Sequence, residues 1–123
     1  MNRYSTTVFG VAILFATSLA LACDYPERPH IPDGEAASKD ELLAAKSGVQ
    51  NFIAAVDEYL TCIEDQEKSA IEDMPDVSEE ELQRRNDLLN KKFDAANEEK
   101  ALVGEQFNQQ IRAYNQKLQE RKE

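Results

Sequence analysis

The chain has 123 residues, with 24 acidic against 14 basic side chains, a net charge of -10 and only four glycines, which limits it to one small domain. The acid excess argues against a nucleic-acid binder, because phosphate contacts draw their affinity from Lys and Arg. One histidine and two cysteines cannot build a zinc cage unaided, and we expect no cofactor. The high charge and low glycine content favour a helical protein.

Residues 1–22 have the features of a secretory signal peptide. A short polar start carries Arg3, an apolar run extends from Val8 to Ala16, and Ala20 and Ala22 form an A-x-A cleavage site. The apolar stretch is about 15 residues, shorter than the roughly 20 that a membrane-spanning helix needs. The sequence therefore predicts export, with cleavage immediately before Cys23.

Cys23 has two competing roles. The residues Leu19 to Cys23 (LALAC) look like a bacterial lipobox, although Ala20 stands where that pattern has leucine. A lipid on Cys23 would attach the protein to a membrane. An exported chain with an even number of cysteines instead tends to pair them, and the extended segment before the first helix is long enough to bring Cys23 to Cys62. We expect the disulfide and keep lipidation, or an unpaired buried Cys62, as alternatives.

The segment after the cleavage site divides into an arm and a first helix. Residues 23–37 hold three of the four prolines, which predicts an extended arm. Ser38 to Glu41 (SKDE) is a capping box, so a helix should begin at 39 and run to about 72. Its apolar residues recur in an a/d heptad pattern. They are Leu42, Ala45, Val49, Phe52, Val56, Tyr59, Ile63 and Ala70.

A second helix follows a short turn. Pro75 ends the first helix and predicts a turn over 73–78. Ser78 to Glu81 (SEEE) is a second capping box, and the helix should extend from 79 to about 121. The seam residues are Leu82, Leu89, Phe93, Ala96, Val103, Phe107, Ile111, Tyr114 and Leu118.

These elements predict an all-α fold, a long antiparallel two-helix hairpin that resembles a coiled coil and carries the proline-rich arm packed along it. A short connection between two long helices leaves an antiparallel arrangement as the only one available. Residues whose numbers add up to roughly 152 should face one another. The hairpin, residues 38–123, should be the single folded unit after the arm.

Acidic residues are concentrated around the predicted turn. We name six of them the acidic tip and consider this surface a binding site for a basic partner or a weak calcium site. The alternative is that the acids form a solvated face without a partner. Glu72 and Asp73 lie near a helix C-terminus, where negative charge is unfavourable by about 0.3 to 1 kcal/mol, so local stability does not explain these two acids. The acidic tip consists of Glu64, Asp65, Glu67, Glu72, Asp73 and Asp76.

A second apolar stripe remains outside the seam. On the second helix Leu88, Ala95 and Leu102 stand at strict seven-residue spacing, and Ile53 and Leu60 form a matching stripe on the first. Two helices cannot bury both stripes. We expect the arm to cover the first-helix stripe and Leu88, Ala95 and Leu102 to contact another protein or a second copy in a four-helix bundle.

A pattern of cysteines, prolines and an IPDG motif runs through the arm and the first helix. Its residues are Cys23, Pro26, Pro29, Ile31, Pro32, Asp33, Gly34, Glu41, Val49, Tyr59, Leu60 and Cys62. Following a signal peptide, this pattern resembles small exported proteins of Gram-negative proteobacteria that have no assigned activity. The resemblance implies a periplasmic location and paired cysteines.

The residue inventory disfavours catalysis, because it offers no nucleophile with a base, no phosphate-binding loop and no metal triad. We expect a non-enzymatic periplasmic protein that acts through protein–protein contacts, as an adaptor or an envelope-assembly factor. The alternatives are a holdase chaperone for exported clients and a lipid-anchored structural protein of the envelope.

Overall fold

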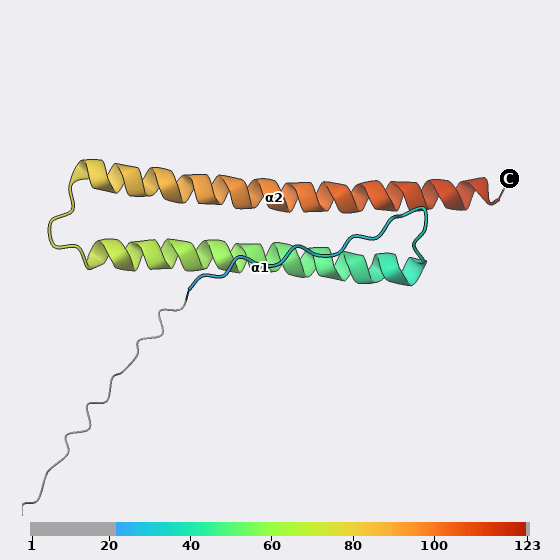
Figure 1. The fold of residues 1–123 in the computed structure, drawn as a ribbon, viewed down its shortest axis with the longest axis horizontal. Coiled ribbons are helices and arrows are strands. Elements are labelled where there is room, and N and C mark those ends of the chain that lie inside the picture. Colours follow the sequence, from blue (N-terminus) through green and yellow to red (C-terminus); the bar gives the residue numbers. More distant parts are fainter. Residues whose placement is uncertain (1–21, 123) are drawn as a thin grey trace, which may run out of the picture.

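The structure is a computed structural model that describes residues 22–122, and it is a two-helix hairpin. Helix α1 (Lys39–Glu72) has 34 residues and helix α2 (Glu79–Glu120) has 42, and the two run antiparallel (Figure 1). An arm without helix or strand precedes α1 and lies along it. The predicted all-α hairpin is therefore confirmed, while the predicted signal peptide, apart from Ala22, lies outside the described residues.

The two helix starts are capped differently. At α1 the Ser38 hydroxyl accepts a hydrogen bond from the Glu41 amide at 3.2 Å, and the Glu41 carboxylate accepts one from the Ser38 amide at 2.7 Å. At α2 the Ser78 hydroxyl accepts from the Glu81 amide at 3.2 Å, but the Glu81 carboxylate binds two arginines instead. The second capping box is therefore only half formed, because charge-assisted bonds to guanidinium groups are stronger than one to a neutral amide.

The core is distributed unequally between the two helices. Helix α2 buries only Ala96 and Val103, and the rest of its predicted seam is half-buried. Helix α1 is covered by α2 on one side and by the arm on another, whereas α2 has α1 as its main neighbour (Figure 1). The buried residues of α1 are Leu42, Ala45, Val49, Phe52, Val56, Leu60 and Ile63.

The second stripe of α1 is covered, as expected, but Tyr59 is less buried than its seam position predicts. Leu60, on the second stripe, is buried at 7% exposure, whereas Tyr59 is half-buried. Ile53, the other member of that stripe, packs against the core. The buried face of α1 is wider than a coiled-coil seam because the arm adds a second covering surface.

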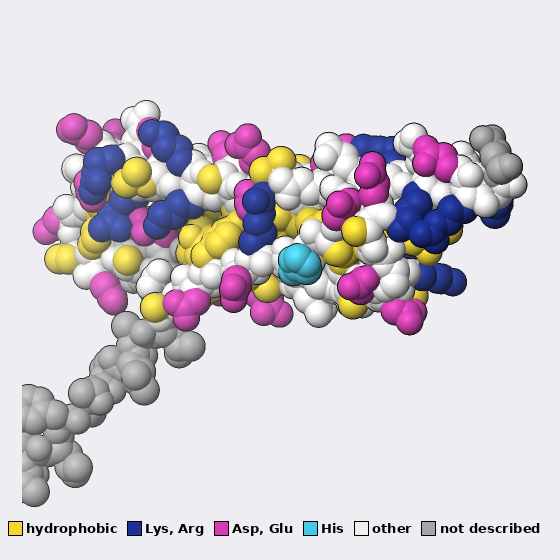
Figure 2. Space-filling model, turned by 45° about the vertical axis from the view of Figure 1, so that its right-hand side comes forward, with side chains coloured by type: hydrophobic (Ala, Val, Ile, Leu, Met, Phe, Trp, Pro, Cys, Tyr) yellow, Lys and Arg dark blue, Asp and Glu magenta, His cyan; other side chains and the backbone are white. Residues whose placement is uncertain are grey.

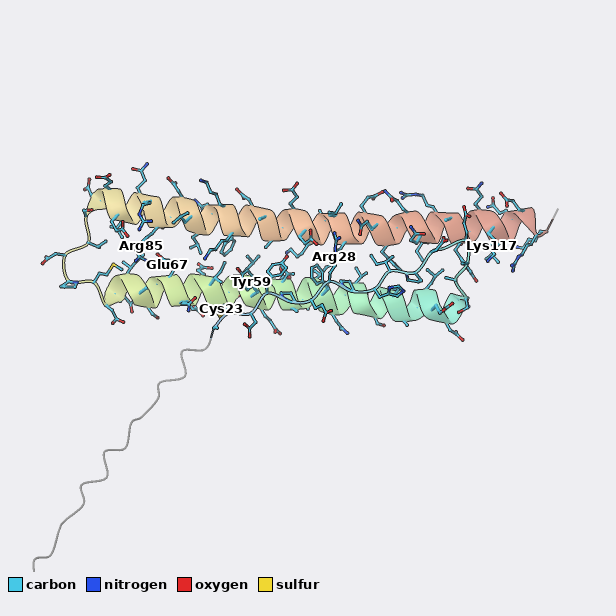
Figure 3. The ribbon with its side chains drawn as sticks, viewed as in Figure 1. Cys23, Arg28, Tyr59, Glu67, Arg85 and Lys117 are labelled. Atoms are coloured by element: carbon cyan, nitrogen blue, oxygen red, sulfur yellow. A yellow bond between two sulfur atoms is a disulfide. The ribbon has the colours of Figure 1, made fainter. Side chains whose placement is uncertain are left out.

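The contact nearest the turn agrees with the predicted register, whereas the ion pair between Asp57 and Lys100, whose numbers add up to 157, is shifted from it. Glu67 and Arg85, whose numbers add up to 152, form an ion pair at 2.9 Å near the turn, and Figure 3 shows the two residues on facing helices. At the other end, Leu42 lines a groove together with Ile111 and Tyr114. Within the described chain, neither helix is long and apolar enough to cross a bilayer.

Candidate interaction surface

A disulfide between Cys23 and Cys62 fastens the start of the arm to α1. The two Cα atoms lie 5.7 Å apart, and no free cysteine remains among residues 22–122. The predicted pairing is therefore present in the structure. A sulfur in a disulfide cannot also carry a lipid through a thioether, so pairing and lipidation of Cys23 exclude one another.

Next to the disulfide, Tyr25 seats the arm on α1. Its ring meets Phe52 with centroids 6.4 Å apart and Tyr59 at 5.0 Å, both edge to face, an arrangement that aromatic pairs prefer. The pKa of Tyr25 is raised, mainly because the ring is partly buried and secondly because the negative charge of Glu99 lies nearby. The sequence patterns did not predict this contact. The signal was present, because a disulfide to Cys62 brings the neighbourhoods of Tyr25 and Tyr59 together.

The middle of the arm also contacts α2. Arg28 Nε lies 2.9 Å from Glu99 Oε1, and Figure 3 shows Arg28 in the space between the arm and α2. Both side chains are partly exposed, so the pair stabilises the fold by only about 0 to 1 kcal/mol. The main effect of this ion pair is to hold the arm against α2, because the disulfide connects the arm only to α1.

The last part of the arm, at Gly34, packs against α2 before the chain turns back to the start of α1. The Gly34 amide donates a hydrogen bond to Gln110 Oε1 at 2.8 Å, and the backbone of Gly34 is packed directly on the Gln110 backbone. Ile31 packs against the core. Tyr114 and Leu118, the last two residues of the predicted seam, lie beyond the point where the arm meets α2 at Gln110, and both are half-buried.

The acidic tip occupies the last turns of α1 and the turn that follows. Within residues 22–122, Glu67 is its one member with an ion-pair partner, Arg85, and the others are exposed. Arg85 also binds Glu81 at 3.1 Å, and hydrogen bonds from Arg84 are the main cause that lowers the pKa of Glu81. The described part of the chain brings no three His, Cys, Asp or Glu residues together as a metal site, so the calcium alternative gains no support.

The stripe on α2 is exposed, as expected. Leu88 is 47% and Leu102 46% exposed, and Ala95 between them is exposed as well. Figure 2 shows a band of hydrophobic side chains between the helices with charged groups along its edges and the single histidine on the surface. Leu43, 52% exposed, is a large apolar residue on α1 that lies outside this stripe.

A search of protein-family models, of curated proteins and of solved structures finds no match to this chain. The resemblance to small exported proteobacterial proteins therefore stays a prediction from the sequence.

Proposed function

We propose that this chain is an exported, non-enzymatic protein that works in the periplasm through protein–protein contacts, as an adaptor or an envelope-assembly factor. The observation that carries the proposal is the unequal covering of the two helices. The arm completes the cover of α1, whereas α2 presents Leu88, Ala95 and Leu102 to solvent. Apolar side chains gathered in this way on a soluble surface favour a contact site.

The chemistry of the described residues supports a binding role over catalysis. Both cysteines are in the disulfide, and His30, the only histidine of the chain, is exposed on the arm. Residues 22–122 therefore offer no thiolate or buried imidazole around which a nucleophilic or acid–base set is usually built.

The disulfide supports the proposed periplasmic location. Disulfides form and persist in oxidising compartments such as the periplasm, and this one follows the predicted cleavage site directly. We expect mass spectrometry of the protein from the cell envelope to show an N-terminus at Cys23, no lipid, and a mass 2 Da below that of the reduced chain. A diacylglycerol on Cys23 would instead establish the lipid-anchored structural protein.

Site-specific photocrosslinking tests the contact role. A photoreactive amino acid replaces Leu88 or Leu102 in the exported protein, and the same residue replaces Leu43 as a matched control of similar exposure. We expect discrete crosslinked products from the two stripe positions and none from position 43, because only the stripe is proposed to face a partner. Equal yields from all three positions, or no product from the stripe, would contradict the proposal.

One observation favours the holdase alternative. An open groove between the helices is lined by Leu42, Leu43, Ile111 and Tyr114, with Lys39 and Lys46 beside it. A chaperone would use such a groove for many unfolded clients. Suppression of the aggregation of a reduced client by the purified protein, together with a smear of crosslinked products from position 43, distinguishes this function from a specific contact.

A further inference from the structure

We propose that the surface around Leu88, Ala95 and Leu102 binds a second copy of this chain, with the two α2 helices antiparallel and a twofold axis at Ala95. The product is a four-helix bundle of two hairpins. The proposed partner of the stripe is thus a second copy of the chain. This inference rests on the proposed function because both assign a protein contact to the same three residues.

Charged residues beside the stripe are ordered by sign along α2. Residues three and four positions from Ala95 lie on the same face of the helix as Ala95. On its N-terminal side these residues are Lys92 and Lys91, and on its C-terminal side they are Glu98 and Glu99. The flanks of the stripe are thus basic before its centre and acidic after it.

This order continues two turns further out. Arg84 lies on the basic half and Glu105 on the acidic half, each seven residues from a residue of the inner set, although each also has an ion-pair partner in its own helix. Charges that change sign at the centre of a stripe are complementary to the same stripe in the opposite direction. An isologous interface, in which one patch binds its own copy, requires this property, whereas a contact with an unrelated protein does not.

Antiparallel packing about Ala95 turns the charge order into specific pairs. Leu88 of one copy faces Leu102 of the other, Lys91 faces Glu98 and Lys92 faces Glu99, and the twofold axis repeats every pair. A parallel arrangement would place Lys opposite Lys and Glu opposite Glu. Charges beside a helical seam set partner choice and orientation in this way in coiled coils.

The side chains needed for these contacts are available. Lys91, Lys92 and Glu98 are exposed, and none has an ion-pair partner in the described part of the chain, while Glu99 is shared with Arg28. Ala95 adds a small residue at the proposed axis, where two helices approach most closely, at an interaxial distance of about 8 to 10 Å. The four leucines of the two stripes then enclose it on both sides.

Reciprocal charge reversal tests the proposal on the purified, oxidised full-length mature protein. Sedimentation equilibrium at low salt should show a dimer for the wild type. K91E and E98K should each weaken association about tenfold or more, because each replaces two attractive pairs with two repulsive ones. A mixture of the two variants, and the double variant K91E/E98K, should associate as the wild type does, because both restore opposite charges at every site.

Two leucine variants complete the test. Leu102→Asp should abolish association, whereas Leu43→Asp should leave it unchanged. Circular dichroism and the intact disulfide would verify that each variant is folded.

A wild type that stays monomeric at millimolar concentration would overturn the proposal, and so would a dimer in which the mixture and the double variant fail to recover. In that case crosslinks from Leu88 and Leu102 to a different protein in the envelope would still support the proposed contact function. Absence of crosslinks as well would contradict both.

Discussion

Reduction of the Cys23–Cys62 disulfide should lower the free energy of unfolding by about 4 kcal/mol. The bond joins residues 39 positions apart, and its loss releases a long loop in the unfolded chain, which raises the entropy of that state. In the folded state the N-terminal end of the arm loses its covalent link to Cys62 of α1, and Tyr25 can leave the rings of Phe52 and Tyr59.

Urea unfolding with and without reductant measures this effect. The chain has no tryptophan, and two of the three tyrosines that follow the predicted cleavage site, Tyr25 and Tyr59, are in contact, so tyrosine fluorescence responds to loss of this cluster while circular dichroism reports on the helices. The matched control is the double variant C23A/C62A, which should unfold like the reduced wild type and show no response to reductant. An unchanged urea midpoint after complete reduction of the wild type would show that the arm is held by its non-covalent contacts alone.

Gly34→Ala should destabilise the protein by about 3 kcal/mol, the second largest effect that we expect. A Cβ atom at this position would overlap the carbonyl oxygen of Gln110, which belongs to the backbone of α2 and cannot rotate away. Forcing an added carbon into a packed contact costs about 1 to 3 kcal/mol, and separation of the arm from α2 also removes the Gly34 to Gln110 hydrogen bond, about 1 kcal/mol. Urea unfolding again provides the measurement.

Gly104→Ala is the matched control for this substitution. Gly104 lies inside α2, and a Cβ atom there would meet nothing within 4 Å. Alanine favours a helix interior over glycine by about 0.5 to 1 kcal/mol, so this variant should be more stable than the wild type. A Gly34→Ala variant as stable as the wild type would mean that the arm does not pass against α2 at Gln110.

Together these two variants test the basis of the proposed interaction surface. The disulfide fixes the beginning of the arm to α1, and Gly34 fixes its end to α2. With both ends fastened, the arm stays over α1 and cannot swing across to shield Leu88, Ala95 and Leu102. The exposure of the stripe is therefore a consequence of how the arm is held.

Local sequence signals were sufficient for the framework of the fold. The capping box at Ser38, the proline at position 75 and the spacing of apolar residues each act over a few positions, and they predicted both helices to within one residue of their observed ends. The exposed stripe was predictable as well, since a seven-residue repeat on a helix places its residues on one face. The number of cysteines and the reach of the arm made the disulfide the expected pairing.

The hairpin, its register near the turn and the apolar stripe outside its seam follow from local sequence patterns. The path of the arm depends on contacts that form only in the folded chain: Tyr25 with Tyr59, Arg28 with Glu99, and Gly34 with Gln110. The fold also leaves Tyr59, a predicted seam residue, only half-buried. An extended, proline-rich segment has no periodicity and makes few local hydrogen bonds, so its position depends on contacts with residues distant in the chain, 76 positions away for Gly34 and Gln110.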